Sequence, residues 1–321
     1  MPTLVETHHE VKLMTIKKIL ITDNVNEKAA AYLKGKGFEV TTVPTQDPGV
    51  LAGLLPGYHG IIVRSATKLR KELLETLPDL KIIGRAGAGL DNIDVAFAKD
   101  KGIEIVNSPM AHAVSVAEHA MALMLSITRN IPKADAAMKA GKWIKRQLKS
   151  NEVRGKVLGI IGFGNIGQQV ARRALAFGMK VYTYDVVPAC NDISEEMGCT
   201  VSEEINEMLP FIDYLTLHVP HNKHTHHLLD ARRLSLLKPG AILINTSRGK
   251  IIDQDALVDA LQQGTIRGAA LDVFKEEPIP QGDPLLELDN VILTPHIASA
   301  TVETQELAAT TVAEEIANFF A

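Results

Sequence analysis

The sequence has few cysteines, little net charge and no long uninterrupted apolar run. Its 321 residues include only two cysteines, and its formal net charge is −4. So few cysteines exclude a disulfide framework and favour a reducing cytoplasm. The small negative charge gives no reason to expect nucleic acid or an anionic membrane as partner. Apolar runs such as 120–125 are far shorter than a membrane span, and residues 1–16 lack the apolar core of a signal peptide.

A glycine-rich turn follows the apolar run 157–161 and leads into a predicted helix over 168–177. Gly162, Gly164 and Gly167 have the spacing G-x-G-x-x-G, which suits a tight strand-to-helix turn, close approach of a pyrophosphate and close helix packing. Asp185 follows the next predicted strand, 180–184. A carboxylate there accepts hydrogen bonds from a ribose and repels a 2′-phosphate. The unit therefore predicts an NAD site, although a turn that binds nothing has the same local pattern.

Short apolar runs alternate with amphipathic segments along most of the chain, and this alternation predicts parallel, doubly wound α/β sheets. The length favours two domains, with a candidate boundary at 107–109. The segment 115–129 is apolar almost all round and predicts a buried helix, with Ser115 and Glu118 as a capping box. Such a helix could lie in a core, between domains or between subunits. Further predicted strands lie at 18–22, 38–43, 60–63, 81–84, 104–106, 214–219, 241–245, 268–273 and 291–293. Further predicted helices lie at 27–36, 69–77, 93–101, 231–237, 254–263 and 302–320.

Three polar residues stand where predicted strands end or shortly after: Arg248, Glu277 and His296. Ligands of parallel sheets bind at the carboxyl ends of the strands. Moving a hydride to or from a hydroxyl-bearing carbon needs a group that exchanges the hydroxyl proton, and an imidazole suits that task. A carboxylate can orient the imidazole, and a guanidinium can grip a substrate carboxylate with two hydrogen bonds. Each residue alone is more often a surface or packing residue, whereas the three together predict a dehydrogenase.

The chain resembles the D-isomer-specific 2-hydroxyacid dehydrogenase family, and within it most of all the D-3-phosphoglycerate dehydrogenases. The resemblance covers nearly everything after residue 17. It rests on segments 162–167, 245–249, 270–274 and 294–297 for the family, and on 63–68, 84–94 and 138–143 for the phosphoglycerate enzymes.

This resemblance implies a Rossmann NAD-binding domain, residues 110–295, inserted into a flavodoxin-like substrate domain, residues 1–109 and 296–321. It implies that Arg248, Glu277 and His296 are the catalytic residues. It further implies groups that bind the cofactor (Gly162, Gly164, Asn165, Ile166, Gly167, Asp185, Val219, Thr246, Ser247, Asp272) and groups that bind substrate (Arg64, Ser65, Gly87, Ala88, Gly89). Candidates for a substrate phosphate are Arg64, Arg85, Lys145 and Arg146.

The expected reaction is therefore NAD-dependent oxidation of 3-phosphoglycerate to 3-phosphohydroxypyruvate, the first step of serine biosynthesis. A glyoxylate or hydroxypyruvate reductase, or a D-lactate-type dehydrogenase, is the alternative enzyme. A dinucleotide-sensing scaffold that binds proteins is the alternative outside enzymes. We expect a cytoplasmic homodimer and a short form without the regulatory domain of many phosphoglycerate enzymes. Met110 and His112 depart from the family pattern beside the expected hinge.

Five histidines crowd the segment 218–227 and suggest a metal site: His218, His221, His224, His226 and His227. Their spacing gathers no three of them on one helix face or strand face. The sequence therefore predicts a surface loop and no metal.

Overall fold

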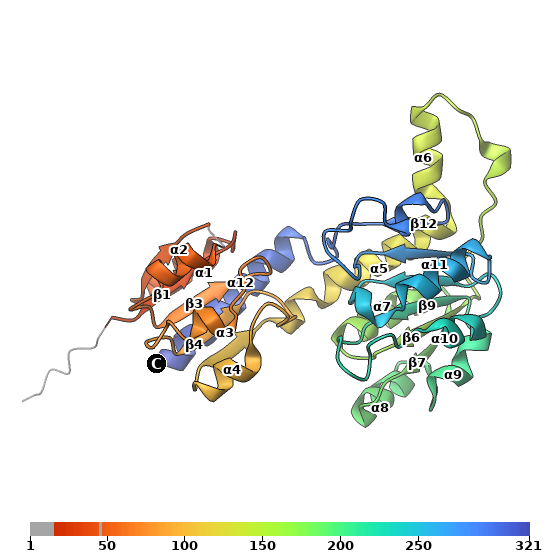
Figure 1. Ribbon diagram of the computed structural model, residues 1–321. Coiled ribbons are helices and arrows are strands. Elements are labelled where there is room, and N and C mark those ends of the chain that lie inside the picture. Colours follow the sequence, from red (N-terminus) through yellow and green to blue (C-terminus); the bar gives the residue numbers. More distant parts are fainter. Residues whose placement is uncertain (1–15, 45–46) are drawn as a thin grey trace, which may run out of the picture. The chain divides into compact units, whose positions relative to one another are not determined.

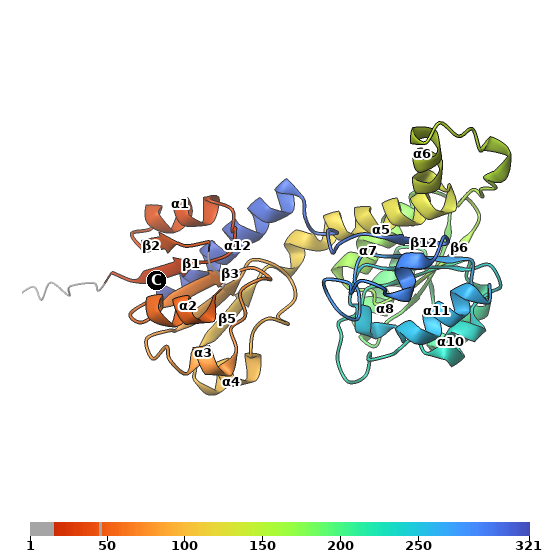
Figure 2. The same cartoon turned by 45° about the horizontal axis from the view of Figure 1, so that its top comes forward.

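The structure, a computed structural model, describes residues 16–44 and 47–321, and Figures 1 and 2 show it from two directions. The chain divides into two compact units, one formed by Met1–Ala111 with Gln305–Ala321 and the other by His112–Thr304. The domain boundaries expected from the sequence, after residues 109 and 295, stay a prediction. The expectation that the N-terminal segment is not a signal peptide concerns residues 1–15, which lie outside the described part of the chain.

The first unit contains a parallel sheet of five strands in the order β2-β1-β3-β4-β5. This is the flavodoxin-like order expected from the sequence. All four pairs of neighbouring strands run parallel. The strands are β1 (Lys18–Ile21), β2 (Glu39–Thr42), β3 (Gly60–Val63), β4 (Ile82–Arg85) and β5 (Glu104–Asn107).

Helices cover both faces of this sheet because successive strand residues point to opposite sides. Ile62 packs on the face that α1 (Lys28–Gly35) and α12 (Val302–Phe320) cover, whereas Ile61 packs on the other face. That second face is covered by α2 (Pro48–Leu54), α3 (Lys71–Leu74) and α4 (Val95–Asp100). Figure 2 shows α1 and α12 on one side of the sheet and α2, α3 and α4 on the other. Burial on both sides explains why the inner strands β1, β3 and β4 are mostly apolar, whereas the edge strands β2 and β5 include polar residues.

The second unit contains a parallel sheet of seven strands in the order β12-β11-β10-β9-β6-β7-β8. This is the Rossmann order extended by a seventh strand, and the direction of winding reverses between β6 and β9. Ligands of such sheets bind at that reversal, outside the carboxyl ends of the strands. The strands are β6 (Val157–Ile161), β7 (Lys180–Tyr184), β8 (Thr200–Val201), β9 (Tyr214–Leu217), β10 (Ile242–Asn245), β11 (Gly268–Leu271) and β12 (Val291–Leu293).

Two layers of helices enclose this second sheet. One face packs against α5 (Ala113–Thr128) and α7 (Asn165–Ala176), with α8 (Pro188–Glu196) beside them. The other face packs against α9 (Ile205–Met208), α10 (Ala231–Leu236) and α11 (Gln254–Gln262). By contrast, α6 (Ile131–Lys139) has no buried residue, and Figure 1 shows it extending away from the sheet of its own unit. Short 3₁₀ helices lie at η1 (Pro109–His112), η2 (Lys145–Gln147), η3 (Leu209–Phe211), η4 (Gly249–Ile251) and η5 (Pro284–Glu287).

The apolar helix expected at 115–129 is present as α5, but the expected capping box is wrong. The helix begins at Ala113 after His112, so Ser115 lies inside its first turn. The Ser115 hydroxyl donates to the carbonyl of His112, 3.2 Å away, and accepts a hydrogen bond from Thr304 Oγ1, 2.9 Å away. A serine inside a helix can satisfy its hydroxyl in this way.

The same part of the chain meets a length and composition test for a membrane span. Pro109–Thr128 has a mean hydropathy of 1.3 over its most apolar window, and 56% of that window is buried inside the protein. Within the second unit, α5 packs against α7, β10 and β11. This burial accounts for its apolar composition, as in the core helix of a folded domain.

Candidate active site

The glycine turn after β6 has the shape that a dinucleotide pyrophosphate needs. Gly162 has φ +94°, and a Cβ there would lie 2.6 Å from the carbonyl oxygen of His218. A Cβ on Gly167 would lie 2.2 Å from the carbonyl oxygen of Gly162, so the helix packs closely on the strand. A Cβ on Gly164 would meet nothing within 4 Å, and α7 begins there without a side-chain cap. The turn therefore leaves open space before the amino end of a long helix, where Asn165 and Ile166 lie and where an anion is favoured.

Asp185 lies directly after β7 and beside this turn. Its Oδ2 accepts a hydrogen bond from the N–H of Phe163, 2.6 Å away, and its Oδ1 accepts one from the N–H of Val187, 2.9 Å away. Strand pairing aligns Ile161 with Tyr184, so the glycine turn and the carboxylate leave the sheet side by side. The carboxylate is half-buried and stabilises the turn through these hydrogen bonds. It lies where this fold holds the ribose of a dinucleotide.

The loops after β9 and β10 supply three further cofactor candidates. Val219 follows β9, and Thr246 and Ser247 follow β10. Thr246 Oγ1 is buried and has no hydrogen-bond partner among the described residues. Buried hydroxyls normally have a partner. This orphaned hydroxyl and the open glycine turn both fit a bound dinucleotide.

Arg248, Glu277 and His296 come together in the second unit at the ends of adjacent strands. They follow β10, β11 and β12, which are neighbours in the sheet. His296 Nδ1 lies 2.7 Å from Glu277 Oε2, and Glu277 Oε1 accepts a hydrogen bond from the N–H of Phe274, 3.0 Å away. Burial alone would raise the pKa of Glu277. The hydrogen bonds from His296 and Phe274, with the charges of His296 and Arg248, outweigh burial and lower that pKa below its ordinary value.

Gly249 explains how the Arg248 loop approaches the Glu277 loop. A Cβ on Gly249 would lie 2.0 Å from the carbonyl carbon of Phe274, so only glycine permits this contact between backbones. Asn245, the last residue of β10, stabilises this loop because its Nδ2 donates a hydrogen bond to the carbonyl of Arg248, 2.9 Å away. Arg248 itself donates from Nη1 to the carbonyl of Ser247, 2.7 Å away. The guanidinium thus comes from a loop that Asn245 holds in shape and that Gly249 allows to pack against its neighbour.

Asp272 is fully buried, and both of its carboxylate oxygens are hydrogen-bonded within the protein. They accept the Thr294 hydroxyl at 2.5 Å and the N–H groups of Ile297 and Ala298 at 2.9 and 2.8 Å. His119 Nε2 lies 3.4 Å from Asp272 Oδ1 and 3.1 Å from Thr294 Oγ1. Burial would raise the pKa of Asp272, but these hydrogen bonds outweigh it and lower the pKa. Asp272 therefore anchors the turn that carries His296, whose φ is +54°.

Two residues of this arrangement, His119 and Thr294, were not singled out from the sequence. Both residues are separated from Asp272 in sequence, His119 by more than 150 positions, and no spacing rule connects them. His119 lies within the helix α5, three positions after Val116 and one before Ala120, both of which are buried. The available signal is a titratable side chain inside an otherwise apolar helix, where an ionisable group needs a partner.

The substrate candidates expected from the resemblance lie in the first unit, also at the carboxyl ends of strands. Arg64 and Ser65 follow β3, and the segment 87–89 follows β4, its neighbour in the sheet. Arg85 pairs with Val63 across these two strands, and its guanidinium lies where a Cβ on Gly87 would be. The Gly87 carbonyl accepts from the N–H of Ser108, and the Ala88 carbonyl accepts from Asn107 Nδ2, at 3.0 and 2.7 Å. Gly89 completes this loop and is half-buried.

The four candidates for a phosphate therefore fall into two groups. Arg64 and Arg85 share one edge of the first sheet, whereas Lys145 and Arg146 are exposed on η2 of the second unit. Figure 1 shows the stretch after α6 looping away from the sheet of that unit. Within the second unit, Lys145 and Arg146 therefore do not join the group formed by Arg248, Glu277 and His296.

The histidine-rich segment forms a surface turn in which three rings touch. His221 Nε2 lies 3.1 Å from His226 Nδ1, and the rings of His226 and His227 stack at 4.0 Å. Burial, together with the charges of the neighbouring histidines and Lys250, lowers the pKa of His226. Among residues 16–44 and 47–321, no three histidine, cysteine or acidic side chains are arranged to hold a metal ion. His218 is separate from this cluster, because its ring turns inward and hydrogen-bonds Thr216 Oγ1 at 3.0 Å.

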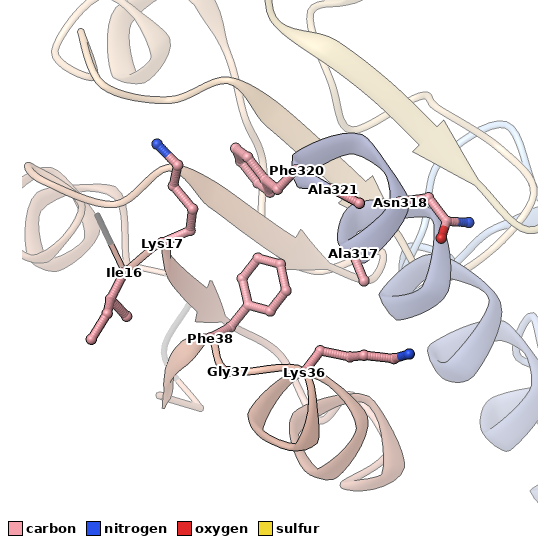
Figure 3. A pocket seen from close by; sticks show the side chains of 9 residues that line it. All are labelled: Ile16, Lys17, Lys36, Gly37, Phe38, Ala317, Asn318, Phe320 and Ala321. Carbon is pink, nitrogen blue, oxygen red and sulfur yellow. The ribbon is translucent and has the colours of Figure 1, made fainter. Parts of the chain in front are cut away.

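A cavity of about 390 Å³ lies in the first unit, away from all of these residues. Figure 3 shows the rings of Phe38 and Phe320 facing each other in it, with Lys17 and Lys36 at its margin. Lys17 and Phe38 precede β1 and β2, so the cavity is at the amino ends of the strands. Ligands of such sheets bind at the opposite ends, and this cavity is therefore not the candidate site.

Known proteins are similar to this chain over most of its length. Residues 121–298 match the family model of the D-isomer specific 2-hydroxyacid dehydrogenase NAD binding domain. The chain is 41% identical over 302 residues to a hydroxypyruvate reductase of Thermotoga maritima, with 93% of this chain and 97% of the relative covered. It is also similar to a solved D-lactate dehydrogenase of Aquifex aeolicus in complex with NAD and lactic acid, with a TM-score of 0.83, 35% identity and coverage of 94% and 95%. The chain belongs to the D-isomer specific 2-hydroxyacid dehydrogenase family.

Within this family the chain is also similar to longer proteins. It is 47% identical over 301 residues to the D-3-phosphoglycerate dehydrogenase of Methanocaldococcus jannaschii, and the match covers 93% of this chain but 56% of that relative. The chain therefore spans a little over half the length of this relative. The family description names an NAD binding domain, and the glycine turn and Asp185 lie within the matched residues 121–298.

Proposed function

We propose that the chain catalyses the NAD-dependent interconversion of a D-2-hydroxy acid and its 2-oxo acid. The observation that carries the proposal is the 2.7 Å contact between His296 Nδ1 and Glu277 Oε2 at the strand ends that also present Arg248. An imidazole oriented by a carboxylate is suited to exchange a proton with a substrate hydroxyl. A neighbouring guanidinium is suited to bind the carboxylate on the adjacent carbon.

The proton is handled by the ring nitrogen that Glu277 does not contact. With Nδ1 donating to Glu277, His296 Nε2 is the atom that accepts the hydroxyl proton during oxidation and returns it during reduction. The lowered pKa of Glu277 keeps its carboxylate ionised at neutral pH. This negative charge stabilises the imidazolium that exists after the proton has been accepted.

NAD, when bound, takes up or returns the hydride at the substrate carbon. The residues that would hold it are those expected from the sequence: the glycine turn with Asn165 and Ile166 for the pyrophosphate, Asp185 for the ribose, and Val219, Thr246 and Ser247 after β9 and β10. We propose that Asp272 acts mainly through the turn that it anchors, because both of its oxygens already accept hydrogen bonds from the protein.

We propose 3-phosphoglycerate as the substrate, with Arg248 on its carboxylate and Arg64, Ser65 and the loop 87–89 as further anion-binding groups. The support is the identity of 47% to a named D-3-phosphoglycerate dehydrogenase, together with Arg64 and Arg85 at one sheet edge. Serine biosynthesis would then be the process served. Hydroxypyruvate or glyoxylate reduction is the alternative, supported by the similarity to a hydroxypyruvate reductase over 97% of that protein.

Steady-state assays of the purified chain with NAD test this proposal. We expect the largest kcat/KM in the 3-phosphoglycerate couple, and lower values with hydroxypyruvate, glyoxylate and pyruvate. Substitution of NADP should lower kcat/KM, because Asp185 repels a 2′-phosphate. Absence of turnover with 3-phosphoglycerate alone would favour the reductase alternative. Absence of turnover with every acid, although NAD binds, would favour a dinucleotide-sensing scaffold.

We also propose that the enzyme is a cytoplasmic homodimer. An apolar helix can mark a contact between subunits, but burial in its own unit already explains the apolar composition of α5. Exposed apolar side chains nearby give a different support: Ile131, Met138 and Trp143, the last 78% exposed, lie on and after α6. Light scattering at micromolar concentration should give the mass of two chains, and a monomer would contradict this proposal.

A further inference from the structure

A buried carboxylate lies beneath the loop that carries Arg64 and Ser65. Asp23 follows β1 by two residues, is only 4% exposed and has φ +54°. Its Oδ2 accepts a hydrogen bond from the N–H of Arg64, 2.7 Å away. Its Oδ1 accepts hydrogen bonds from Thr67, through the N–H at 3.1 Å and through the hydroxyl at 2.5 Å. One acidic side chain therefore engages both ends of the four-residue loop 64–67.

Asn92 holds the same loop by its carbonyl groups. Its side-chain Nδ2 donates to the carbonyl of Arg64 at 2.8 Å and to the carbonyl of Thr67 at 2.7 Å. Asn92 is itself tied back to the chain, because its own carbonyl accepts from the N–H of Leu69 at 2.9 Å. The N–H and the carbonyl of Arg64 are thus both held by buried side chains. This restraint sets the direction in which the Arg64 side chain leaves the backbone.

The rest of the loop faces outward. Ser65 and Ala66 are exposed, and within the described part of the chain no group accepts a hydrogen bond from the N–H of either residue. Arg64 is half-buried, and its Nη1 donates to the carbonyl of Asn24, 3.2 Å away. A guanidinium, a hydroxyl and two successive N–H groups therefore remain on a loop whose two ends are clamped from inside. Groups of these kinds suit an anion.

We infer that Asp23 and Asn92 are positioning residues that hold the loop 64–67 in the shape in which it receives an anionic group of the substrate. This inference rests on the proposed function, since that function supplies the substrate. Neither residue touches the substrate. Both act through the backbone of Arg64 and Thr67, so their loss weakens substrate binding and leaves the proton transfer in the second unit unaffected.

The exchange Asp23→Asn separates positioning from electrostatics because the two predict changes of opposite sign. Asparagine tolerates φ +54° and has nearly the same volume. It replaces an acceptor oxygen by an NH₂ group that cannot accept from the loop N–H groups. The exchange also removes a negative charge near the anion, which alone would lower the KM. Positioning instead predicts that the KM for the acid rises about 10- to 100-fold, with kcat and the NAD dissociation constant little changed.

Two further comparisons make the test specific. Asp100→Asn, at the exposed end of α4, removes the same charge from the same unit and should leave the KM unchanged. Thr67→Val removes the hydroxyl that donates to Asp23, whereas Thr67→Ser keeps it. We expect the KM to rise in the valine variant and to stay close to that of the unaltered enzyme in the serine variant. Thermal melting identifies variants that do not fold. If Asp23→Asn does not fold, the comparison of Thr67→Val with Thr67→Ser tests the inference.

The outcomes distinguish this inference from the proposed function. A wild-type chain that is active, with an unchanged or lower KM in both Asp23→Asn and Thr67→Val, overturns the inference and leaves the function intact. A wild-type chain that neither turns over nor binds 3-phosphoglycerate or the other 2-hydroxy acids, measured by titration calorimetry, overturns both. A raised KM with unchanged NAD binding supports the inference.

Discussion

In each unit, a buried carboxylate at the carboxyl edge of the sheet holds a functional loop by hydrogen bonds. In the first unit Asp23 accepts two backbone N–H groups and a threonine hydroxyl from the loop that carries Arg64. In the second unit Asp272 accepts two backbone N–H groups and a threonine hydroxyl from the turn that carries His296. A carboxylate is compact and can accept several hydrogen bonds, so it can fix an irregular loop that has no regular backbone pairing.

The difference lies in the side chain that accompanies each carboxylate at its loop. Asp272 has the imidazole of His119 beside it, whereas the loop above Asp23 is completed by the amide of Asn92. In the turn that Asp272 holds, the left-handed residue is His296, the proposed proton carrier, whereas at the loop that Asp23 holds it is the acid itself. Under the proposed function, the second unit orders ionisable groups for chemistry, and the first orders hydrogen-bond donors for binding. Variants in the second unit should therefore lower kcat, and variants in the first should raise KM.

The largest effect should follow from His296→Asn. Asparagine tolerates φ +54°, so the turn is preserved, but the group that exchanges the proton is lost. We expect kcat to fall about 10²- to 10⁴-fold while the NAD dissociation constant stays the same. Steady-state kinetics and titration with NADH measure the two quantities. Retained turnover would remove the proposed proton-transfer role and with it the contrast between the units.

Glu277→Gln should have a smaller effect with a characteristic pH dependence. The amide still fills the space beside His296 but carries no charge, so the imidazolium loses a favourable interaction. We expect kcat to fall about 10- to 100-fold, and the reduction rate to decline at a lower pH than in the unaltered enzyme. Initial rates between pH 5 and pH 9 measure this shift. An unchanged profile would mean that Glu277 only packs beside the imidazole.

Asp272→Asn tests the comparison most directly because Asp23→Asn is its counterpart in the first unit. One acceptor becomes a donor that faces an N–H group of the 294–298 turn. We expect a loss of about 1–3 kcal/mol in the free energy of unfolding and a fall of about tenfold in kcat. Denaturant unfolding and steady-state assays on both variants measure the contrast. A raised KM with normal kcat in Asp272→Asn would contradict the division of roles.

The smallest effect concerns the stability of the second unit in acid. Burial lowers the pKa of His218 to about 3 from its ordinary 6.5. Between these values the unfolded chain binds a proton that the folded chain does not, so stability falls as pH decreases from 6.5 toward 3. We expect His218→Gln to reduce this loss by about 1–2 kcal/mol at pH 5. Scanning calorimetry at pH 7 and pH 5 measures it, and an identical pH dependence in both proteins would contradict it.

Much of the fold could be predicted from the sequence because parallel strands buried on both faces are apolar throughout. The strands β3, β7 and β12 and the helix α12 occupy the residues expected for them. The helix α6 was not predicted, and the structure buries none of its residues. The capping box at Ser115 was wrong because a hydrogen bond from Thr304, far along the chain, satisfies the serine inside the helix.

Local sequence alone determined the glycine turn, the acid after β7 and the candidates at strand ends, because each depends on backbone freedom or on a residue type at one point of the chain. Only the tertiary structure decided which of these groups meet. Adjacent strands bring Glu277 to His296, and Gly249 lets two loops touch. Buried carboxylates at Asp23 and Asp272 find their donors across long sequence separations. The physical reason is that hydrogen bonds between distant segments depend on strand order and burial, which no local spacing encodes.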